Sequence, residues 1–341
     1  VRHARVPRTA MRAYVPSIGP MPGTPQPRTW WAPLPPADGA AVMATGVVSV
    51  GLHLTGHEVL SRIALVAAGA AWLALAADFT VRLLRERERW AAEAGTPAAL
   101  TAVAATAVLG TRLSALGWQG LAEALLALAA ALWPGLLFLV VRRWERHMPG
   151  VVLLACVATQ GLALLGATLA ADLGVAWLAH TALVFFWLGL VLYAVALWRF
   201  DLRQVAEGAG DHWIAGGALA LSALAGAQLV AARRSGGPYL WNDDDNGVLR
   251  TVTAALLVLA LGWYCVLWAA ELRWPRPAYD VRRWATVFPM AMTAVAVLSV
   301  AIVLGVPWLW GPGQVLLWIA VAVWPAVCAA AVVDIRSRAP R

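Results

Sequence analysis

The residues of this sequence that could do chemistry are few, and the densest group is the acidic run Asn242–Gly247, which reads NDDDNG. This run resembles the start of a calcium-binding loop, in which Asn242, Asp244 and Asn246 would be ligands. Such a loop needs a bidentate glutamate at its twelfth position, and that position falls on Thr253. The run therefore favours a solvated external loop. A membrane enzyme with a metal at Asp243, Asp244 and Asp245 is kept as an alternative.

Other motifs that carry chemistry are absent from the sequence. There is no HExxH, no phosphate-binding loop and no GxSxG nucleophile elbow. The three cysteines, Cys156, Cys265 and Cys328, stand alone in apolar stretches and form no CxxC pair. We therefore expect no cofactor, no metal centre and no enzymatic activity.

The composition explains this scarcity, because 61% of the 341 residues are apolar, 13% are charged, and the mean hydropathy is +0.71. A soluble domain has about 25% charged residues, so a soluble enzyme is excluded. A membrane-spanning helix needs about 20 mainly apolar residues, and the sequence predicts an all-α integral membrane protein with ten of them. The predicted spans are 38–55, 61–84, 97–115, 119–141, 150–171, 174–198, 212–232, 249–270, 284–304 and 313–333.

The distribution of arginine predicts the orientation of these spans. The net charge is +8, and with the N-terminus placed inside, 21 of the 26 arginines fall on the cytoplasmic side. The basic charge is therefore a topology signal and not a sign of nucleic-acid binding. We expect a disordered cytoplasmic tail over residues 1–35, a transmembrane domain over 36–334 and a cytoplasmic tail over 335–341, in the cell membrane.

The ten spans are of two kinds that alternate along the chain. The odd-numbered spans are rich in Gly, Ala, Ser and Thr, whereas the even-numbered spans carry most of the bulky side chains. Small residues let helices approach closely. The alternation predicts five hairpins, in which the odd-numbered helices form an inner ring around a pore; a solid bundle with tightly packed inner helices is the alternative.

Ionisable residues inside the predicted spans are potential functional groups. Asp78 precedes Arg82 by four residues, the spacing of an ion pair on one helix face. Glu123 and His53 lie near the outer ends of their spans, where water reaches them. No chain of buried carboxylates emerges, which argues against a proton-driven pump.

Three segments resemble a known family. The residues 284–290, which read WATVFPM, are similar to the ninth-helix motif of the tellurite-resistance/dicarboxylate transporter family, which includes the slow-type anion channels of plants. The residues 41–49 (AVMATGVVS) and 213–218 (WIAGGA) are similar to its first and seventh helices, and the resemblance covers about 35–334. It implies ten helices in five hairpins, a pore lined by the odd-numbered helices, a homotrimer, and a pore-closing phenylalanine, here Phe288.

The resemblance directs attention to particular residues of the inner helices. Pro289 disfavours helical geometry at Phe288, and a bend there could aim the aromatic ring at the pore axis. The other candidates at kinks, close approaches or the pore lining are Gly46, Gly110, Gly161, Gly217, Thr45, Ser49, Thr106, Thr159, Ser222 and Thr293. We expect hydroxyls and backbone amides of these helices to select for anions.

The predicted function is passage of small inorganic or organic anions, C4-dicarboxylates such as malate among them, across the lipid bilayer. One alternative is a proton-coupled exporter of dicarboxylate or sulfite, with Glu123 or His53 as the coupling group. A scaffold subunit with a blocked centre is a further alternative, beside the membrane enzyme considered above.

Overall fold

The part of the chain that the structure describes is mainly helical. The structure is a computed structural model that describes residues 39–208, 210–235, 243–275 and 279–338, and these contain no β-strand, only an isolated bridge between Met148 and Phe200. The all-helical prediction is therefore confirmed. The predicted tail over residues 1–35 lies outside the described residues, as do residues 339–341.

Five long helices have their side chains buried along most of their length. They are α1 (Gly39–Leu54), α4 (Thr101–Ser114), α6 (Leu154–Leu173), α9 (Trp213–Ser235) and α11 (Trp284–Leu304). Short 3-10 turns precede three of them, η2 (Pro97–Leu100) before α4, η3 (Gly150–Leu153) before α6 and η4 (Val281–Arg283) before α11. In the most apolar stretches of α6, α9 and α11, 94%, 89% and 89% of the residues are buried. Their small side chains allow this close packing.

The other five long helices expose most of their apolar side chains. They are α2 (Glu58–Arg85), α5 (Gln119–Val141), α7 (Ala176–Arg199), α10 (Asp243–Arg273) and α12 (Trp310–Arg338), the last preceded by the turn η5 (Pro307–Leu309). Only 17–33% of their most apolar stretches is buried. Eight described helices are long and apolar enough to cross a membrane, whereas α1 and α4 have 16 and 14 residues.

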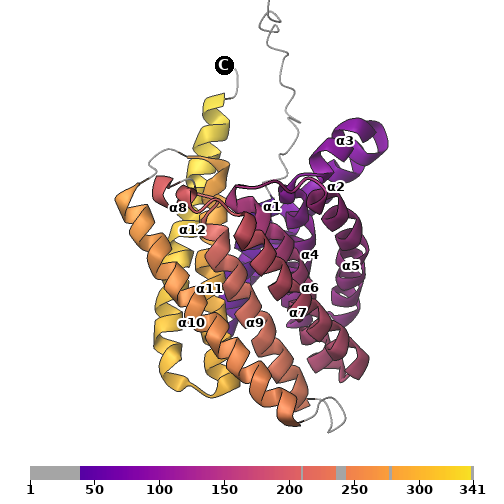
Figure 1. Cartoon of the computed structure of the whole chain (residues 1–341), viewed down its shortest axis with the longest axis vertical. Coiled ribbons are helices and arrows are strands. Elements are labelled where there is room, and N and C mark those ends of the chain that lie inside the picture. Colours follow the sequence, from indigo (N-terminus) through magenta and orange to yellow (C-terminus); the bar gives the residue numbers. More distant parts are fainter. Residues whose placement is uncertain (1–38, 209, 236–242, 276–278, 339–341) are drawn as a thin grey trace, which may run out of the picture. The chain divides into compact units, whose positions relative to one another are not determined.

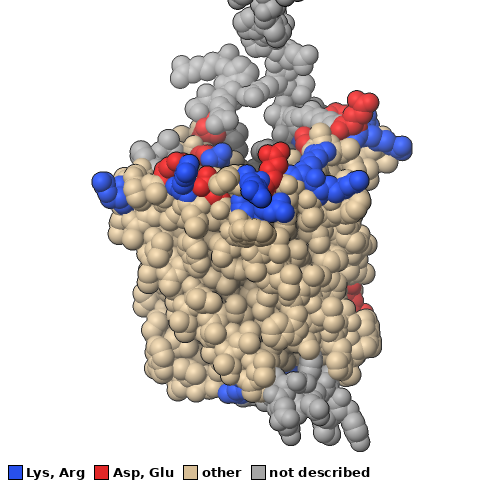
Figure 2. Space-filling model, in the orientation of Figure 1, with Lys and Arg blue, Asp and Glu red and all other residues tan. Residues whose placement is uncertain are grey.

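The buried helices contact one another in a closed cycle. In order, α1 contacts α4, α4 contacts α6, α6 contacts α9, α9 contacts α11, and α11 contacts α1 again. Each exposed helix lies against two neighbours in this cycle; α2, for example, contacts both α1 and α4. Two short helices, α3 (Arg87–Ala94) and α8 (Arg203–Glu207), lie at the same end of the bundle (Figure 1). Charged side chains gather at that end, and the middle of the visible face is uncharged (Figure 2).

The helix boundaries differ from the prediction in three ways. Residues 243–246, which include three aspartates, were predicted to form a loop ahead of a span starting at 249, but their backbone forms the first turn of α10. Their side chains lie outside the described part, so the metal alternative there stays untested. The helices α3 and α8 were not predicted, because neither is apolar enough to register as a span. The spans predicted at 61–84 and 313–333 extend to Glu58–Arg85 and Trp310–Arg338.

Tryptophans of three exposed helices donate hydrogen bonds to threonines of the buried helices. Trp72 Nε1 of α2 donates to Thr106 Oγ1 of α4 over 2.8 Å, and Trp133 Nε1 of α5 donates to Thr159 Oγ1 of α6 over 2.9 Å. Trp324 Nε1 of α12 donates to Thr45 Oγ1 of α1 over 2.9 Å. Each bond joins an exposed helix to the buried helix of the next hairpin. The bond from α12 to α1 joins the last long helix to the first.

We expect Trp324→Phe to lower the free energy of unfolding by about 0.5–1.5 kcal/mol, because it removes one hydrogen bond while keeping an aromatic ring. Thermal unfolding in detergent measures the change. Trp198→Phe is the matched control, since Trp198 on α7 is 84% exposed. An equal loss of stability in both variants would show that the bond to Thr45 contributes nothing.

Candidate functional site

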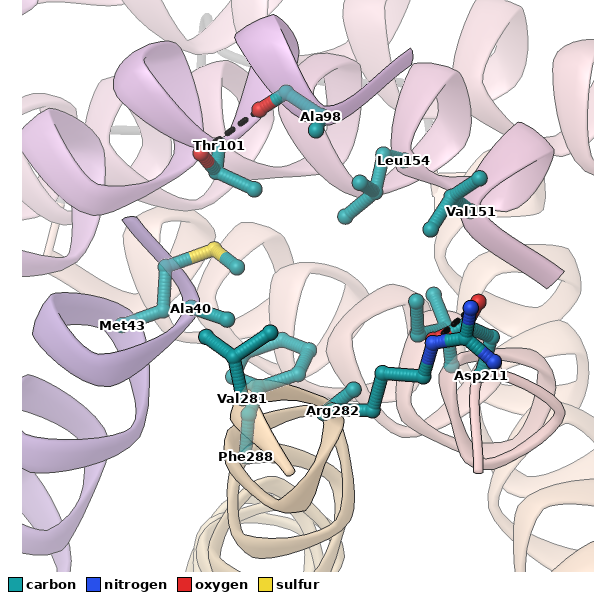
Figure 3. Close-up of a pocket in the computed structure, with 12 residues that line it drawn as sticks. Ala40, Met43, Ala98, Thr101, Val151, Leu154, Asp211, Val281, Arg282 and Phe288 are labelled. Atoms are coloured by element: carbon teal, nitrogen blue, oxygen red, sulfur yellow. Dashed lines mark hydrogen bonds and ion pairs between the residues drawn. The ribbon is translucent and has the colours of Figure 1, made fainter. Parts of the chain in front are cut away.

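A cavity lies where all five buried helices begin. Its lining side chains come from the first two turns of these helices or from the turns that precede them, with Met43 from α1, Thr101 from α4, Leu154 from α6, Ile214 from α9 and Phe288 from α11. The empty volume is about 440 Å³, part of it open to solvent. Figure 3 shows these elements around a central space, with Phe288 at its base. The cavity therefore leads from one end of the bundle toward the middle of the helix cycle.

Phe288 is the largest apolar side chain of this cavity and is 1% exposed. Helix α11 continues through Pro289, so this proline does not end the helix, although it removes one backbone hydrogen bond. Helix α9 approaches Phe288 closely, because a Cβ built at Gly217 would lie 2.8 Å from Pro289 Cγ and 3.2 Å from Phe288 Cε1. A side chain at position 217 would thus collide with the Phe288–Pro289 segment. Gly217 fixes how close α9 comes to the aromatic ring.

Three further glycines lie where neighbouring buried helices approach each other. A Cβ at Gly46 of α1 would lie 2.8 Å from Val108 Cγ1 of α4, and one at Gly110 of α4 would lie 2.6 Å from Leu165 Cδ2 of α6. At Gly161 of α6 the corresponding distance to Ala107 Cβ is 3.2 Å. These positions have little room for a larger side chain. The glycines therefore allow short distances between neighbouring helices of the cycle.

The hydroxyls that were expected to select for anions donate elsewhere. Five of them donate to the backbone carbonyl oxygen four residues earlier in their own helix over 2.7–2.8 Å: Thr45, Thr106, Thr159, Ser222 and Thr293. Ser49 Oγ of α1 donates to the carbonyl oxygen of Ser61 in α2 over 2.7 Å. Three of the threonines also accept the tryptophan bonds described above. In this conformation the protons of these hydroxyls are bonded to carbonyl oxygens, and their role in selecting anions stays a prediction.

Helix N-termini are a source of positive potential at the cavity, beside Arg282. All five buried helices begin there, and none of them has an acidic residue in its first turn. The first N–H groups of α4, α6, α9 and α11 donate to carbonyl oxygens of the preceding turns, and the helix dipole places partial positive charge at that end. Such ends attract anions. The charged side chains among the lining residues are Asp211, just before α9, and Arg282 in η4.

A buried ion pair lies at the opposite end of the cycle, between α4 and α2. Arg112 of α4 has no exposed side-chain surface; its Nη2 donates to Glu58 Oε1 over 2.8 Å and its Nε donates to Ser61 Oγ over 3.0 Å. Glu58 Oε2 lies 2.7 Å from His53 Nδ1, and Arg62 Nε donates to Glu58 Oε1 over 3.0 Å. Sequence reasoning missed the role of Glu58. An arginine inside an apolar span was the signal, because it needs a counter-ion.

The other ionisable residues singled out in the sequence lie apart from the cavity. The predicted pair of Asp78 and Arg82 is confirmed, with Asp78 Oδ2 2.7 Å from Arg82 Nη2, and Arg82 also pairs with Glu93 of α3. Glu123 is exposed on α5. Among the residues whose side chains are described, no three His, Cys, Asp or Glu residues are grouped to hold a metal ion. The residues brought together are therefore Phe288, Pro289 and Gly217.

A comparison with protein families identifies the chain. The model of the family described as SLAC1, voltage-dependent anion channel, matches residues 33–332. The chain belongs to the SLAC1 family of voltage-dependent anion channels. This confirms the resemblance to the tellurite-resistance/dicarboxylate transporter family. Proteins of the SLAC1 family are channels or transporters, so the chain is a multi-pass membrane protein of anion transport. A search of curated proteins finds no match.

Proposed function

We propose that the protein conducts small anions through a pore that runs along the axis of the buried helix cycle and is closed by Phe288. In this proposal all ten long helices cross the bilayer as five hairpins, and α1, α4, α6, α9 and α11 line the path. The cavity with Phe288 at its base carries the proposal, because all five helices of the closed cycle or the turns before them line it, as they would line the mouth of a shut pore.

The closing step follows from the chemistry of the ring. An aromatic side chain in a narrow path offers no group that replaces the hydration shell of an anion, so water and ions are excluded. Passage requires the Phe288 ring to leave the axis. In this closed conformation the ring lies against Gly217 of α9, since a Cβ built there would lie 3.2 Å from Phe288 Cε1. The glycine thus lets the ring fit in its closing position.

The end with the cavity is proposed to face the cytoplasm. Arginines lie at or just after the C-terminal ends of the exposed helices at this end: Arg85 on α2, Arg142 after α5, Arg199 on α7 and Arg273 on α10. Arginine-rich loops remain on the cytoplasmic side of a membrane. Both termini would then be cytoplasmic, with a transmembrane domain over 36–334 flanked by cytoplasmic tails, in the cell membrane. The family resemblance adds a homotrimer with three separate pores.

Anion flux into liposomes that contain the purified protein tests the proposal. Chloride, nitrate, malate and sulfite are compared side by side. We expect at least one of them to enter the liposomes with protein faster than it enters protein-free liposomes. For a channel, the reversal potential follows the anion gradient alone. Flux indistinguishable from that of empty liposomes for every anion would contradict the proposal.

A proton-coupled carrier is the second candidate, and the contact between His53 and Glu58 favours it. These side chains share a short contact of 2.7 Å, are about one-third exposed and lie beside the buried Arg112. Proton coupling needs a side chain that can bind and release a proton, and histidine is such a side chain. For such a carrier, the reversal potential shifts when the pH gradient changes at constant anion concentrations, and His53→Gln abolishes that shift. A reversal potential independent of pH rejects the carrier and keeps the channel.

A further inference from the structure

Two side chains of opposite charge lie at the cavity among otherwise mainly apolar residues. Asp211 precedes α9, and its side chain is 11% exposed; Arg282 belongs to η4, and its side chain is 52% exposed. Arg282 Nε lies 4.0 Å from Asp211 Oδ2 and 3.8 Å from Asp280 Oδ2. Figure 3 shows Asp211 and Arg282 next to each other on one side of the cavity. A carboxylate in the cavity of an anion pathway opposes the ion that the pathway conducts, so its presence needs an explanation.

The backbone around Asp211 is held closely in place. Gly150 of η3 leaves no room for a side chain, because a Cβ there would lie 2.2 Å from the carbonyl oxygen of Asp211. On the other side, Gly210 has a φ of +96°, and its N–H donates to His212 Nδ1 over 3.1 Å. The Asp211 carbonyl oxygen accepts from the N–H of Ile214 over 3.1 Å. The backbone that carries the carboxylate is therefore held between η3 and α9, which keeps this charge at the cavity.

We infer that Asp211 makes the pore favour monovalent over divalent anions. The Coulomb energy between two charges is proportional to their product, so a fixed carboxylate raises the energy of a divalent anion twice as much as that of a monovalent one. The helix N-termini attract both kinds, and the half-exposed Arg282 offsets part of the charge of Asp211. The inference rests on the proposed pore and narrows its substrates to anions of single charge, with dicarboxylates passing more slowly.

The matched control is Asp280, which contacts the same arginine from outside the cavity. Asp280 is not among the lining residues, and its side chain is 58% exposed. Asp211→Asn and Asp280→Asn each remove one negative charge and one ion-pair partner of Arg282. Asparagine retains the size and the hydrogen-bonding oxygen of aspartate. Only Asp211→Asn changes the fixed charge inside the cavity.

The experiment measures the permeability of succinate relative to monomethyl succinate in liposomes that contain the protein. The pH is chosen so that succinate carries two negative charges and monomethyl succinate carries one. These probes are of similar size, so the ratio reports charge. We expect Asp211→Asn to raise the ratio about three- to tenfold, Arg282→Gln to lower it, and Asp280→Asn to change it less than twofold. An unchanged ratio in Asp211→Asn, or an equal rise in Asp280→Asn, overturns the inference.

Two further measurements separate the possible failures. A second variant that removes the charge, Asp211→Ser, should raise the ratio in the same way. It decides the matter where Asp211→Asn does not fold, and an unchanged ratio in Asp211→Ser overturns the inference. If chloride passes but the pore does not discriminate by charge, the proposed pore stands and the inference about Asp211 is wrong. If no anion passes, both the proposed pore and the inference are wrong.

Discussion

Phe288→Ala raises the anion flux of liposomes that contain the protein by about tenfold or more, if the phenylalanine closes the pore. Phe288 is the largest apolar side chain at the base of the cavity and is 1% exposed. Its removal lets water occupy the narrowest part of the path, so an anion keeps more of its hydration shell. A barrier lowered by about 1.4 kcal/mol corresponds to a tenfold faster flux. Phe288→Leu keeps an apolar but smaller side chain, so its flux should lie between that of the unaltered protein and that of Phe288→Ala.

The control for this variant is Phe186→Ala. Phe186 of α7 is also fully buried, but it packs near Gly226 of α9 and does not line the cavity. Each substitution should cost about 3–5 kcal/mol of stability, because a buried phenylalanine is truncated. Only Phe288→Ala should increase the flux. Equal flux increases in both variants would indicate general loosening of the bundle, and no increase in correctly assembled Phe288→Ala would contradict the gate.

Glu58→Gln is expected to lower the thermal unfolding midpoint by about 5–10 °C, because it leaves the charge of Arg112 buried without a counter-ion. The guanidinium has no exposed surface, whereas the Glu58 side chain is about one-third exposed. Arg112→Met breaks the same pair, but the charge that remains is that of Glu58, which water reaches. Glu58 also keeps its contacts with Arg62 and His53. We therefore expect Arg112→Met to destabilise the protein less than Glu58→Gln.

Thermal unfolding of the detergent-solubilised protein checks this order. Glu123→Gln is the control, because Glu123 is an exposed carboxylate of α5, and its replacement should leave the midpoint unchanged. A Glu58→Gln midpoint equal to that of the Glu123→Gln control would mean that the Arg112 charge is balanced by something other than Glu58. A larger loss for Arg112→Met than for Glu58→Gln would also contradict the argument.

The sequence allows the helical elements to be predicted better than their interactions. Long apolar stretches register as helices because a bilayer imposes a minimum length, and small residues such as Gly46 and Gly217 mark the helices that pack closely. The pairing of Glu58 with Arg112 could not be predicted, since the two are 54 residues apart and meet only when α2 lies beside α4. The placement of Asp211 in the cavity likewise depends on three helices meeting.

The threonines illustrate why residue type alone does not give the hydrogen-bond partners of a side chain. Thr106 and Thr159 were expected to offer their hydroxyls to an anion, which is reasonable for polar groups in apolar helices. In a helix, however, a threonine hydroxyl can donate to the carbonyl oxygen one turn earlier, and this occurs at both positions. The lone pair that is left accepts from a tryptophan of a neighbouring helix. Which partner wins is decided by geometry that the sequence does not contain.

The hydrogen bond from Trp324 to Thr45 has a consequence for biosynthesis, because 279 residues separate its ends along the chain. At a translation rate of roughly 5–20 residues per second, Thr45 leaves the ribosome about 15–55 s before its partner. During that interval the first helix has no final neighbour on one flank, and its Gly- and Ala-rich surface faces lipid or the insertion machinery. A nascent chain stalled before the last hairpin should therefore remain an open arc, susceptible to proteolysis and to association with other unfinished chains.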